Sequence, residues 1–447
     1  MENYDQVFVI SDLHMAAAPG LFRSGEQLER RLKEIAALPG SVVLVINGDF
    51  VDFLVGRVPG DYYNVAGALA TLEALSHRWS QLFSTLRVVA ESKKLVITIG
   101  NHDLELMSSK VRKRLEGLIG PIQWGMWKEG SPAEDRGRFE CWVGGRRVKC
   151  IHGNGEDTWN VYHLPRVEAE LLEGSAAPCA GTRLVVDILN EAKAVDPFLE
   201  VLKPEDSSLL LIALARQKAL YAKVPLLVGA VVQQGTTMRR FLSGLSTTQL
   251  APTAETLLAE LAAGEVQPEG VEEGERLGLG GLLLDSLLGR NPSENLYEAM
   301  RDWLERKGQD IYDLQGPDPT MEARKDNAGA DILVAGHTHL ARCLRNGPGI
   351  FLNAGTWTNL MRIPSIKLRS ALAFAEVAEA MDRARGTPDS PGSLDPLSPY
   401  LFDPRNCVHI RVVEGMVRAE LQETRADGSV QVVAAEVVPA RMEQNHA

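Results

Sequence analysis

Residues 42–52 read VVLVINGDFVD, an apolar run that ends abruptly in amide and carboxylate side chains. Four other stretches have the same organisation: 7–14 (VFVISDLH), 95–103 (LVITIGNHD), 147–154 (RVKCIHGN) and 331–339 (DILVAGHTH). A short apolar run of this kind is typical of a strand that is buried on both faces of a parallel sheet. Such a sheet brings the carboxyl ends of its strands to one edge, where ligands bind. We therefore expect the five polar clusters, which come from distant parts of the chain, to form one site.

Between these runs the sequence alternates between helix and strand patterns. Ser24 and Gln27 have capping-box spacing, and apolar residues then recur at helical intervals until Pro39-Gly40. A strand, a crossover helix and a second strand imply parallel neighbours. Residues 65–91 predict a further helical region before the third strand, and residues 139–151 predict a hairpin.

The stretch from 153 to 330 interrupts this alternation. It contains few strand patterns and four helical ones, at 183–194, 207–223, 253–263 and 293–307. Both of its ends lie at polar clusters, which favours a mostly helical insertion that acts as a lid over the site. The alternative is an ordinary second domain remote from the chemistry. We expect residues 1–152 and 331–447 to form the catalytic domain in either case.

The last part of the chain returns to strand patterns. Residues 408–421 and 430–438 predict two closing antiparallel strands. The proline-rich segment 385–404 between them and the fifth cluster predicts an irregular connection. The fold class expected from all these patterns is α/β.

Composition narrows the class of protein. Of the 447 residues, 45% are hydrophobic and 24% are charged, as in an ordinary globular protein. The net charge of −12 argues against long nucleic acid as a partner. The five cysteines are few, odd in number and without a CxxC pair, which argues against a disulfide framework or a structural zinc site and fits the reduced cytoplasm.

The sequence patterns predict neither a secretory signal nor a transmembrane helix. The polar, acidic residues 1–6 lead directly into a strand, so no secretory signal is expected. The most apolar long stretch, 209–232, is interrupted by Arg216, Lys218, Lys223 and Pro225, which disfavours a transmembrane helix. This stretch could equally contribute a homo-oligomer contact or the core of the insertion.

The five clusters contain the residue types that bind metals. Five of the nine histidines fall in them, and their carboxylates and amides are the co-ligands. Imidazole and carboxylate without thiolate suit manganese, iron or zinc. The candidate ligands are Asp12, His14, Asp49, Asn101, His152, His337 and His339. Seven are too many for one ion, so we expect two, with the Asp49 carboxylate as the bridge between them. Asp52 would instead cap the following segment or hold a histidine.

Taken together and in this order, the motifs resemble those of the calcineurin-like metallophosphoesterase family. They are Asp-x-His at 12–14, Gly-Asp-x-x-Asp at 48–52, Gly-Asn-His-Asp at 100–103, a lone histidine at 152 and Gly-His-x-His at 336–339. The resemblance covers residues 5–160 and 328–360. It implies a four-layer αββα sandwich, here with a large, mostly helical insertion.

The resemblance also implies a role for each residue. Asp12, His14 and His339 would hold one ion, Asn101, His152 and His337 would hold the other, and Asp49 would bridge them. A hydroxide between the ions would attack phosphorus, and the ions would neutralise charge on the phosphoryl oxygens. His102 would bind the phosphate or protonate the leaving oxygen, with Asp103 orienting its imidazole.

The substrate is expected to be a small-molecule phosphomonoester or phosphodiester. The Asp49-x-x-Asp52-Phe53 motif and the insertion after His152 are also similar to those of bacterial UDP-2,3-diacylglucosamine pyrophosphatases, but that family has arginine at the position of His102. A nucleotide-sugar or lipid pyrophosphatase, a nuclease, and a non-catalytic interaction protein on the same scaffold remain as alternatives. The loop 154–160 would touch the substrate or merely lead into the insertion.

Overall fold

The computed structural model describes residues 1–17, 21–125, 137–162, 171, 177–203, 207–217, 220, 222–224, 226–227, 292–307, 310–387 and 390–441. The chain divides into two compact units. The first comprises Met1–Val186, Tyr312–Leu360 and Asp403–Ala447, and the second comprises Asp187–Ile311 and Met361–Phe402. Residues 153–186 therefore belong with the first unit, whereas residues 361–402 join the helical segment. This division differs from the expected insertion at 153–330.

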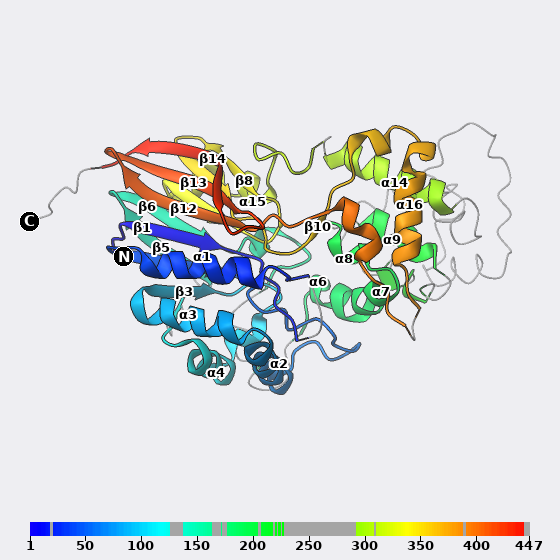
Figure 1. The fold of residues 1–447 in the computed structure, drawn as a ribbon, viewed down its shortest axis with the longest axis horizontal. Helices are drawn as coiled ribbons and strands as arrows, with labels where there is room; N and C mark the ends of the chain where they lie inside the picture. Colours follow the sequence, from blue (N-terminus) through cyan, green and yellow to red (C-terminus); the bar gives the residue numbers. More distant parts are fainter. Residues whose placement is uncertain are drawn as a thin grey trace, which may run out of the picture. The chain divides into compact units, whose positions relative to one another are not determined.

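A seven-stranded sheet forms the first half of the first unit (Figure 1). Its strands run in the order β14-β13-β12-β1-β2-β3-β4. β1 (Gln6–Ile10), β2 (Val42–Asn47), β3 (Lys94–Thr98) and β4 (Gln123–Trp124) are parallel neighbours, as the crossover pattern predicts. β12 (Asn406–Val413), β13 (Met416–Thr424) and β14 (Val430–Pro439) extend the sheet in antiparallel fashion from β1.

The prediction of two strands at the carboxyl-terminal end is wrong, because the structure has three there: β12, β13 and β14. Residues 408–421 are not a single strand but a hairpin of β12 and β13, which turns at Glu414 and Gly415. Both of these residues have positive φ angles, 51° and 75°, so the backbone reverses within a pattern that otherwise looks continuously apolar.

A second sheet of five strands has the order β5-β6-β7-β9-β8. β5 (Arg138–Val143) and β6 (Arg146–Ile151) form the predicted hairpin. β6, β7 (Ile332–Ala335) and β9 (Gly349–Asn353) are parallel, and β8 (Arg342–Asn346) pairs antiparallel with β9. β6 and β7 are thus neighbours in the sheet, although the whole helical segment separates them in the sequence.

Alternating residues of each strand serve two different cores. Phe8 and Ile10 of β1 pack towards α1 (Gly25–Ala37), α2 (Val65–Arg78), α3 (Ser80–Ser92) and α4 (Ser109–Ile119), which cover one face of the first sheet (Figure 1). Val7 and Val9 point the other way, into the core between the two sheets. This alternation is the two-residue period of a strand that is buried on both faces.

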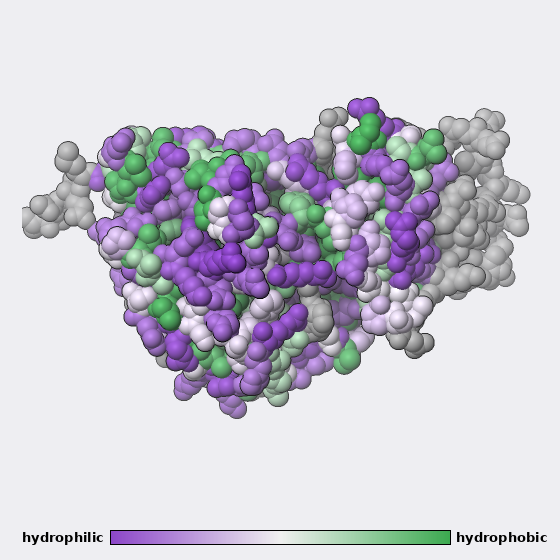
Figure 2. All heavy atoms as spheres, in the orientation of Figure 1, coloured by the Kyte–Doolittle hydropathy of each residue, from purple (hydrophilic) through white to green (hydrophobic). Residues whose placement is uncertain are grey.

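The outer face of the second sheet is covered by a smaller layer. Leu333 and Phe351 are fully buried there, and Met321 of α15 (Pro319–Ala323) packs against them. The first unit is therefore a helix–sheet–sheet–helix sandwich, which confirms the predicted fold class. In the view of Figure 2, hydrophilic residues predominate over this unit and apolar residues are scattered, because the apolar side chains are used inside.

The second unit is mostly helical where it is described. It contains α7 (Asn190–Val195), α8 (Phe198–Val201), α9 (Ser207–Ala215), α14 (Pro292–Lys307) and α16 (Ala371–Ala384). The predicted helix at 207–223 is shorter than expected, and the one at 253–263 lies outside the described residues. No helix within the described part of the chain has both the length and the apolarity that a membrane crossing requires.

Charged side chains join the two sequence segments of this unit. Arg216 follows α9 and donates to the Asp382 carboxylate of α16 at 2.9 Å. Asp196 is fully buried, and the guanidinium of Arg385 lies 3.9 Å from its carboxylate. These contacts explain why residues 361–402 belong with the helical segment.

Candidate metal centre

The predicted polar clusters meet where the strands of both sheets end. Asp12 and His14 follow β1, Asp49 follows β2, and Asn101 follows β3. The second sheet contributes the remaining three candidate ligands, His152 after β6 and His337 and His339 after β7. Six of the seven are buried, and His337 is partly exposed. The structure thus brings together all seven of the residues that the sequence analysis selected as ligands.

Five of these seven residues have a left-handed backbone. The φ angles are 55° at Asp12, 45° at His14, 49° at Asp49, 70° at His337 and 61° at His339. A residue with a side chain is held in such a conformation at a cost of about 1–3 kcal/mol, and such positions cluster at functional sites. The strand ends therefore turn sharply, and the turns aim these side chains at a common point.

Glycines next to the ligands allow neighbouring strand ends to approach closely. A Cβ atom at Gly336 would overlap the hydroxyl of Ser11 and lie 2.6 Å from the Asp12 carboxylate. A Cβ atom at Gly100 would overlap the Asp49 carboxylate. Only glycine fits at these two positions, because residues from other strand ends occupy the space that a side chain would take.

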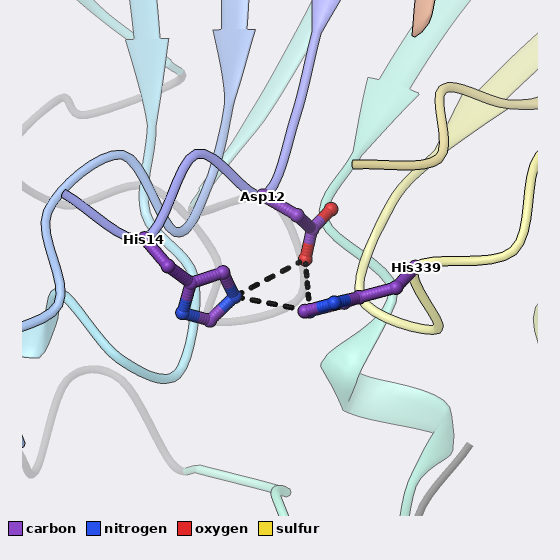
Figure 3. A group of neighbouring side chains, drawn as sticks. All are labelled: Asp12, His14 and His339. Carbon is purple, nitrogen blue, oxygen red and sulfur yellow. Dashed lines mark hydrogen bonds and ion pairs between the residues drawn. The ribbon is translucent and has the colours of Figure 1, made fainter. Parts of the chain in front are cut away.

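Asp12, His14 and His339 form one group of potential ligand atoms (Figure 3). Nε2 of His14 lies 3.0 Å from Nε2 of His339 and 3.8 Å from the Asp12 carboxylate. Nε2 of His339 lies 3.4 Å from the same Asp12 oxygen. Figure 3 shows the two rings and the carboxylate converging from two loops, with Asp12 and His14 on one and His339 on the other, as the ligands of a single ion do.

The second group surrounds Asn101. Its side-chain oxygen lies 3.3 Å from Nε2 of His152 and 3.0 Å from Nδ1 of His337. Asp49 Oδ2 lies 3.2 Å from Nε2 of His152 and 3.5 Å from Nε2 of His14. One carboxylate oxygen of Asp49 therefore faces nitrogen atoms of both groups.

Three of the imidazoles have their outward nitrogen bound to an acceptor. Nδ1 of His14 lies 3.1 Å from the Asp52 carboxylate, and Nδ1 of His152 lies 2.9 Å from the backbone oxygen of Asn47. Nε2 of His337 lies 3.0 Å from the Asp157 carboxylate. An N–H on the outward nitrogen leaves a lone pair on the inward one, which is the arrangement found around metal-bound histidine. The donor set of imidazoles, carboxylates and an amide oxygen therefore fits a metal site.

The electrostatics of the centre favour positive charge. Burial lowers the pKa of His14, but hydrogen bonds to Asp12 and Asp52 outweigh it and raise that pKa to about 10. Burial is likewise outweighed at His152, where the Asp49 carboxylate raises the pKa to about 9. Burial opposes ionisation of Asp49 too, yet the neighbouring histidines hold its pKa well below the usual range. Such an environment attracts cations.

His102 lies beside this centre and is partly exposed. Its Nδ1 lies 3.0 Å from the Asp52 carboxylate, and its ring meets that of His14 edge to face. Its backbone N–H donates to Asp49 at 2.8 Å. His102 also offers a ligand atom close to those of His14 and Asp49, so its position suits either the substrate or an ion.

Asp103 does not orient the His102 ring, contrary to our prediction. Its carboxylate accepts hydrogen bonds from the backbone N–H groups of Gly100 at 2.7 Å and Phe50 at 2.9 Å. Burial and the nearby charge of Asp49 raise the pKa of this carboxyl group. Asp103 thus ties the loop after β3 to the loop after β2, and the acceptor for His102 is Asp52.

Several residues without a predicted specific role contact the candidate ligands. The backbone oxygen of Asn47 contacts His152. The side chains of Asp157 and Asn160 contact His337 and Asn101, respectively. Asp157 and Asn160 belong to the polar loop 154–160, which the sequence marked without assigning it to these partners. Gly153, which directly precedes this loop, has a φ angle of 112°.

Comparison with known proteins supports the family resemblance. Residues 6–198 match the family model described as calcineurin-like phosphoesterase. No curated protein matches the chain.

Matching solved structures include vacuolar protein sorting 29 from Cryptosporidium parvum, 12% identical with a TM-score of 0.28, and a predicted phosphoesterase from Streptococcus pneumoniae TIGR4, 9% identical with a TM-score of 0.27. Each alignment covers 98% of both chains. Phosphopantetheinyl hydrolase from Mycobacterium tuberculosis is 12% identical with a TM-score of 0.23, over 79% of this chain and 89% of that one.

Proposed function

We propose that this chain is a dinuclear-metal-dependent phosphoesterase, because residues 6–198 match the family model described as calcineurin-like phosphoesterase. The observation that carries the proposal is the position of Asp49. Its Oδ2 lies 3.2 Å from His152 and 3.5 Å from His14, which belong to different ligand groups. A carboxylate between two sets of imidazole nitrogens is the arrangement that a pair of ions requires.

The proposed assignment gives each group one ion. Asp12, His14 and His339 would hold the first, Asn101, His152 and His337 would hold the second, and Asp49 would contact both. When bound, such ions lower the pKa of a coordinated water towards about 7 and neutralise charge on the phosphoryl group.

His102 is the proposed proton donor to the leaving oxygen. With Nδ1 held by Asp52 at 3.0 Å, its Nε2 remains available for the substrate. An imidazole within reach of the leaving oxygen can donate a proton to it. Asp52 would keep the ring in one orientation.

We propose a small-molecule phosphomonoester or phosphodiester as the substrate, in the cytoplasm. A nucleotide-linked pyrophosphate and a nucleic acid are the alternative substrates. Hydrolysis of p-nitrophenyl phosphate and bis-p-nitrophenyl phosphate with added Mn²⁺ tests the activity, and a panel of esters and nucleotide-linked pyrophosphates then ranks the substrates. Bound metal without turnover of any panel member would instead indicate a non-catalytic interaction protein on this scaffold.

A further inference from the structure

The loop after His152 contacts the candidate ligands of only one of the two groups. We infer that Asp157 and Asn160 are positioning residues, which orient His337 and Asn101 and thereby set the affinity for the second ion. This inference rests on the proposed function. It gives loop 154–160 a role that differs from both substrate contact and simple connection.

Asp157 holds the ring of His337. Its Oδ2 lies 3.0 Å from Nε2 of His337 and accepts the side-chain N–H of Asn160 at 2.7 Å. Its Oδ1 accepts the backbone N–H of Trp159 at 2.9 Å. The carboxylate is thus fixed on both oxygens, and it directs the other ring nitrogen of His337 towards Asn101, 3.0 Å away. A carboxylate in this position also makes the imidazole a stronger ligand.

Asn160 acts on the other member of the pair. Its side-chain oxygen accepts a hydrogen bond from the amide nitrogen of Asn101 at 3.3 Å. This contact decides which end of the Asn101 amide faces the histidines, because the nitrogen is used by Asn160 and the oxygen is left for His152 and His337. Without it the amide could turn its nitrogen towards the metal position, where a donor N–H cannot bind a cation.

The loop itself is closed by its own backbone and by the segment that follows. The Asn154 side chain donates to the backbone oxygen of Asn160 at 2.9 Å, and the backbone N–H of Asn160 donates to Asp157 at 2.9 Å. Gly181, in α6 (Ala180–Arg183), donates its N–H to Trp159 at 2.7 Å. A Cβ atom at Gly181 would overlap the Asn160 side chain. The position of Asn160 therefore depends on close packing against α6.

The two ion positions have different supports. In the first group, the ring of His14 is held by the carboxylate of Asp52, a contact that does not involve loop 154–160. In the second group, His152 is held by the backbone oxygen of Asn47, whereas His337 and Asn101 depend on the loop. Removal of the Asp157 carboxylate should therefore lower the affinity for the second ion about 10–100-fold, which is the usual effect of losing such a partner. The first ion should stay bound.

The test measures metal binding by the full-length protein, with Mn²⁺ as the probe. Titration with Mn²⁺, followed by metal analysis and electron paramagnetic resonance, counts bound ions and separates a spin-coupled pair from a single ion. Asp157→Ala should bind one ion at a free Mn²⁺ concentration that gives the wild type two, and its spectrum should be that of a single ion. Asp157→Asn should be intermediate, because its amide oxygen still accepts the N–H but carries no charge.

Asp331→Ala is the matched control. Asp331 immediately precedes β7, the strand that leads to His337, and binds Arg146 and Arg441 at the opposite end of that strand. It should retain both ions even if the fold is less stable. Two ions bound to Asp157→Ala with wild-type affinity, or equal loss of both ions, would overturn the inference. A wild type that never binds a pair would contradict the proposed function itself, which is a different result.

Discussion

Oδ2 of Asp52 lies 3.0 Å from Nδ1 of His102, and the same oxygen lies 3.1 Å from Nδ1 of His14. The other oxygen of Asp52 accepts the backbone N–H groups of Leu54 and Val55, so the carboxylate cannot turn away. One atom thus holds both the proposed proton donor and a candidate metal ligand. Burial opposes ionisation of Asp52, but the two histidines keep its pKa well below the usual range.

Asp52→Asn should therefore impair two functions at once. We expect turnover to fall about 100-fold, because His102 loses the carboxylate that holds its Nδ1 and orients its ring. The affinity for the first ion should fall about tenfold through His14. Kinetics at saturating Mn²⁺ isolates the first effect, and Mn²⁺ titration measures the second. Asp61→Asn, at a carboxylate that pairs with Arg57 instead, should change neither quantity. Unchanged kcat in Asp52→Asn would exclude the proposed role.

His102→Ala and Asp49→Ala should separate catalysis from metal binding. His102→Ala should lose about 100-fold or more of the turnover and keep both ions, because the seven proposed ligands are intact. Asp49→Ala should lose metal as well, because Asp49 faces both groups. Metal analysis beside kinetics distinguishes the two variants. Equal loss of metal in both would show that His102 is a ligand.

Gly100→Ala should abolish metal binding without adding or removing a ligand. The new Cβ atom would overlap the Asp49 carboxylate and lie 2.6 Å from its backbone nitrogen, so the strand end must shift. Gly117→Ala in α4 is the control, because a Cβ atom there meets only the far end of the Arg114 side chain, at 3.9 Å. Metal stoichiometry and thermal unfolding of the two variants give the comparison. Normal metal content in Gly100→Ala would mean that the Asp49 position can relax.

His409 should make stability depend on pH at a place remote from the metal centre. The ring stacks on Phe8 with centroids 4.0 Å apart, and its nitrogens contact Gln6 and Gln422. Burial, followed by the charge of Arg411, lowers its pKa to about 3 from 6.5, although Glu420 opposes the shift. The folded protein therefore keeps this histidine neutral while the unfolded chain binds a proton below pH 6.5.

The sign follows from proton binding. Because the unfolded state binds the extra proton, the free energy of unfolding should fall as pH drops from 6.5 towards 3, by about 1.4 kcal/mol per pH unit. His409 should thus contribute about 2 kcal/mol of lost stability at pH 5 relative to pH 7. Urea unfolding of wild type and His409→Gln in chelator-treated buffer measures it. An identical pH slope in both proteins would refute the prediction.

The convergence of the seven candidate ligands could be predicted from the sequence because each of them stands at the end of a strongly apolar strand. Strand-end position is a local property, and parallel pairing then brings the ends together. The partner of His102 could not be found in this way. Asp103 is next to His102 in the sequence, and Asp52 follows the neighbouring strand β2. Only the directions of the two turns decide which of these carboxylates reaches the ring.

Other features depend on contacts between distant segments. The Asp157–His337 contact joins the two sides of the helical segment, and no local pattern identifies such a pair. The assignment of residues 361–402 to the second unit rests on ion pairs such as Arg216–Asp382, which likewise cannot be read locally. The turn at Glu414-Gly415 was missed because the apolar pattern on either side hides it.

β1 is hydrogen-bonded to β2 on one side and to β12 on the other. A ribosome adds about 5–20 residues per second, so tens of seconds separate the synthesis of β1 from that of Asn406, where β12 begins. During this time one edge of β1 lacks its neighbour in the nascent chain, and such an edge is a template for wrong pairing. The growing polypeptide therefore carries an aggregation hazard that the finished sheet removes, and coexpressed chaperones should raise the yield of folded protein.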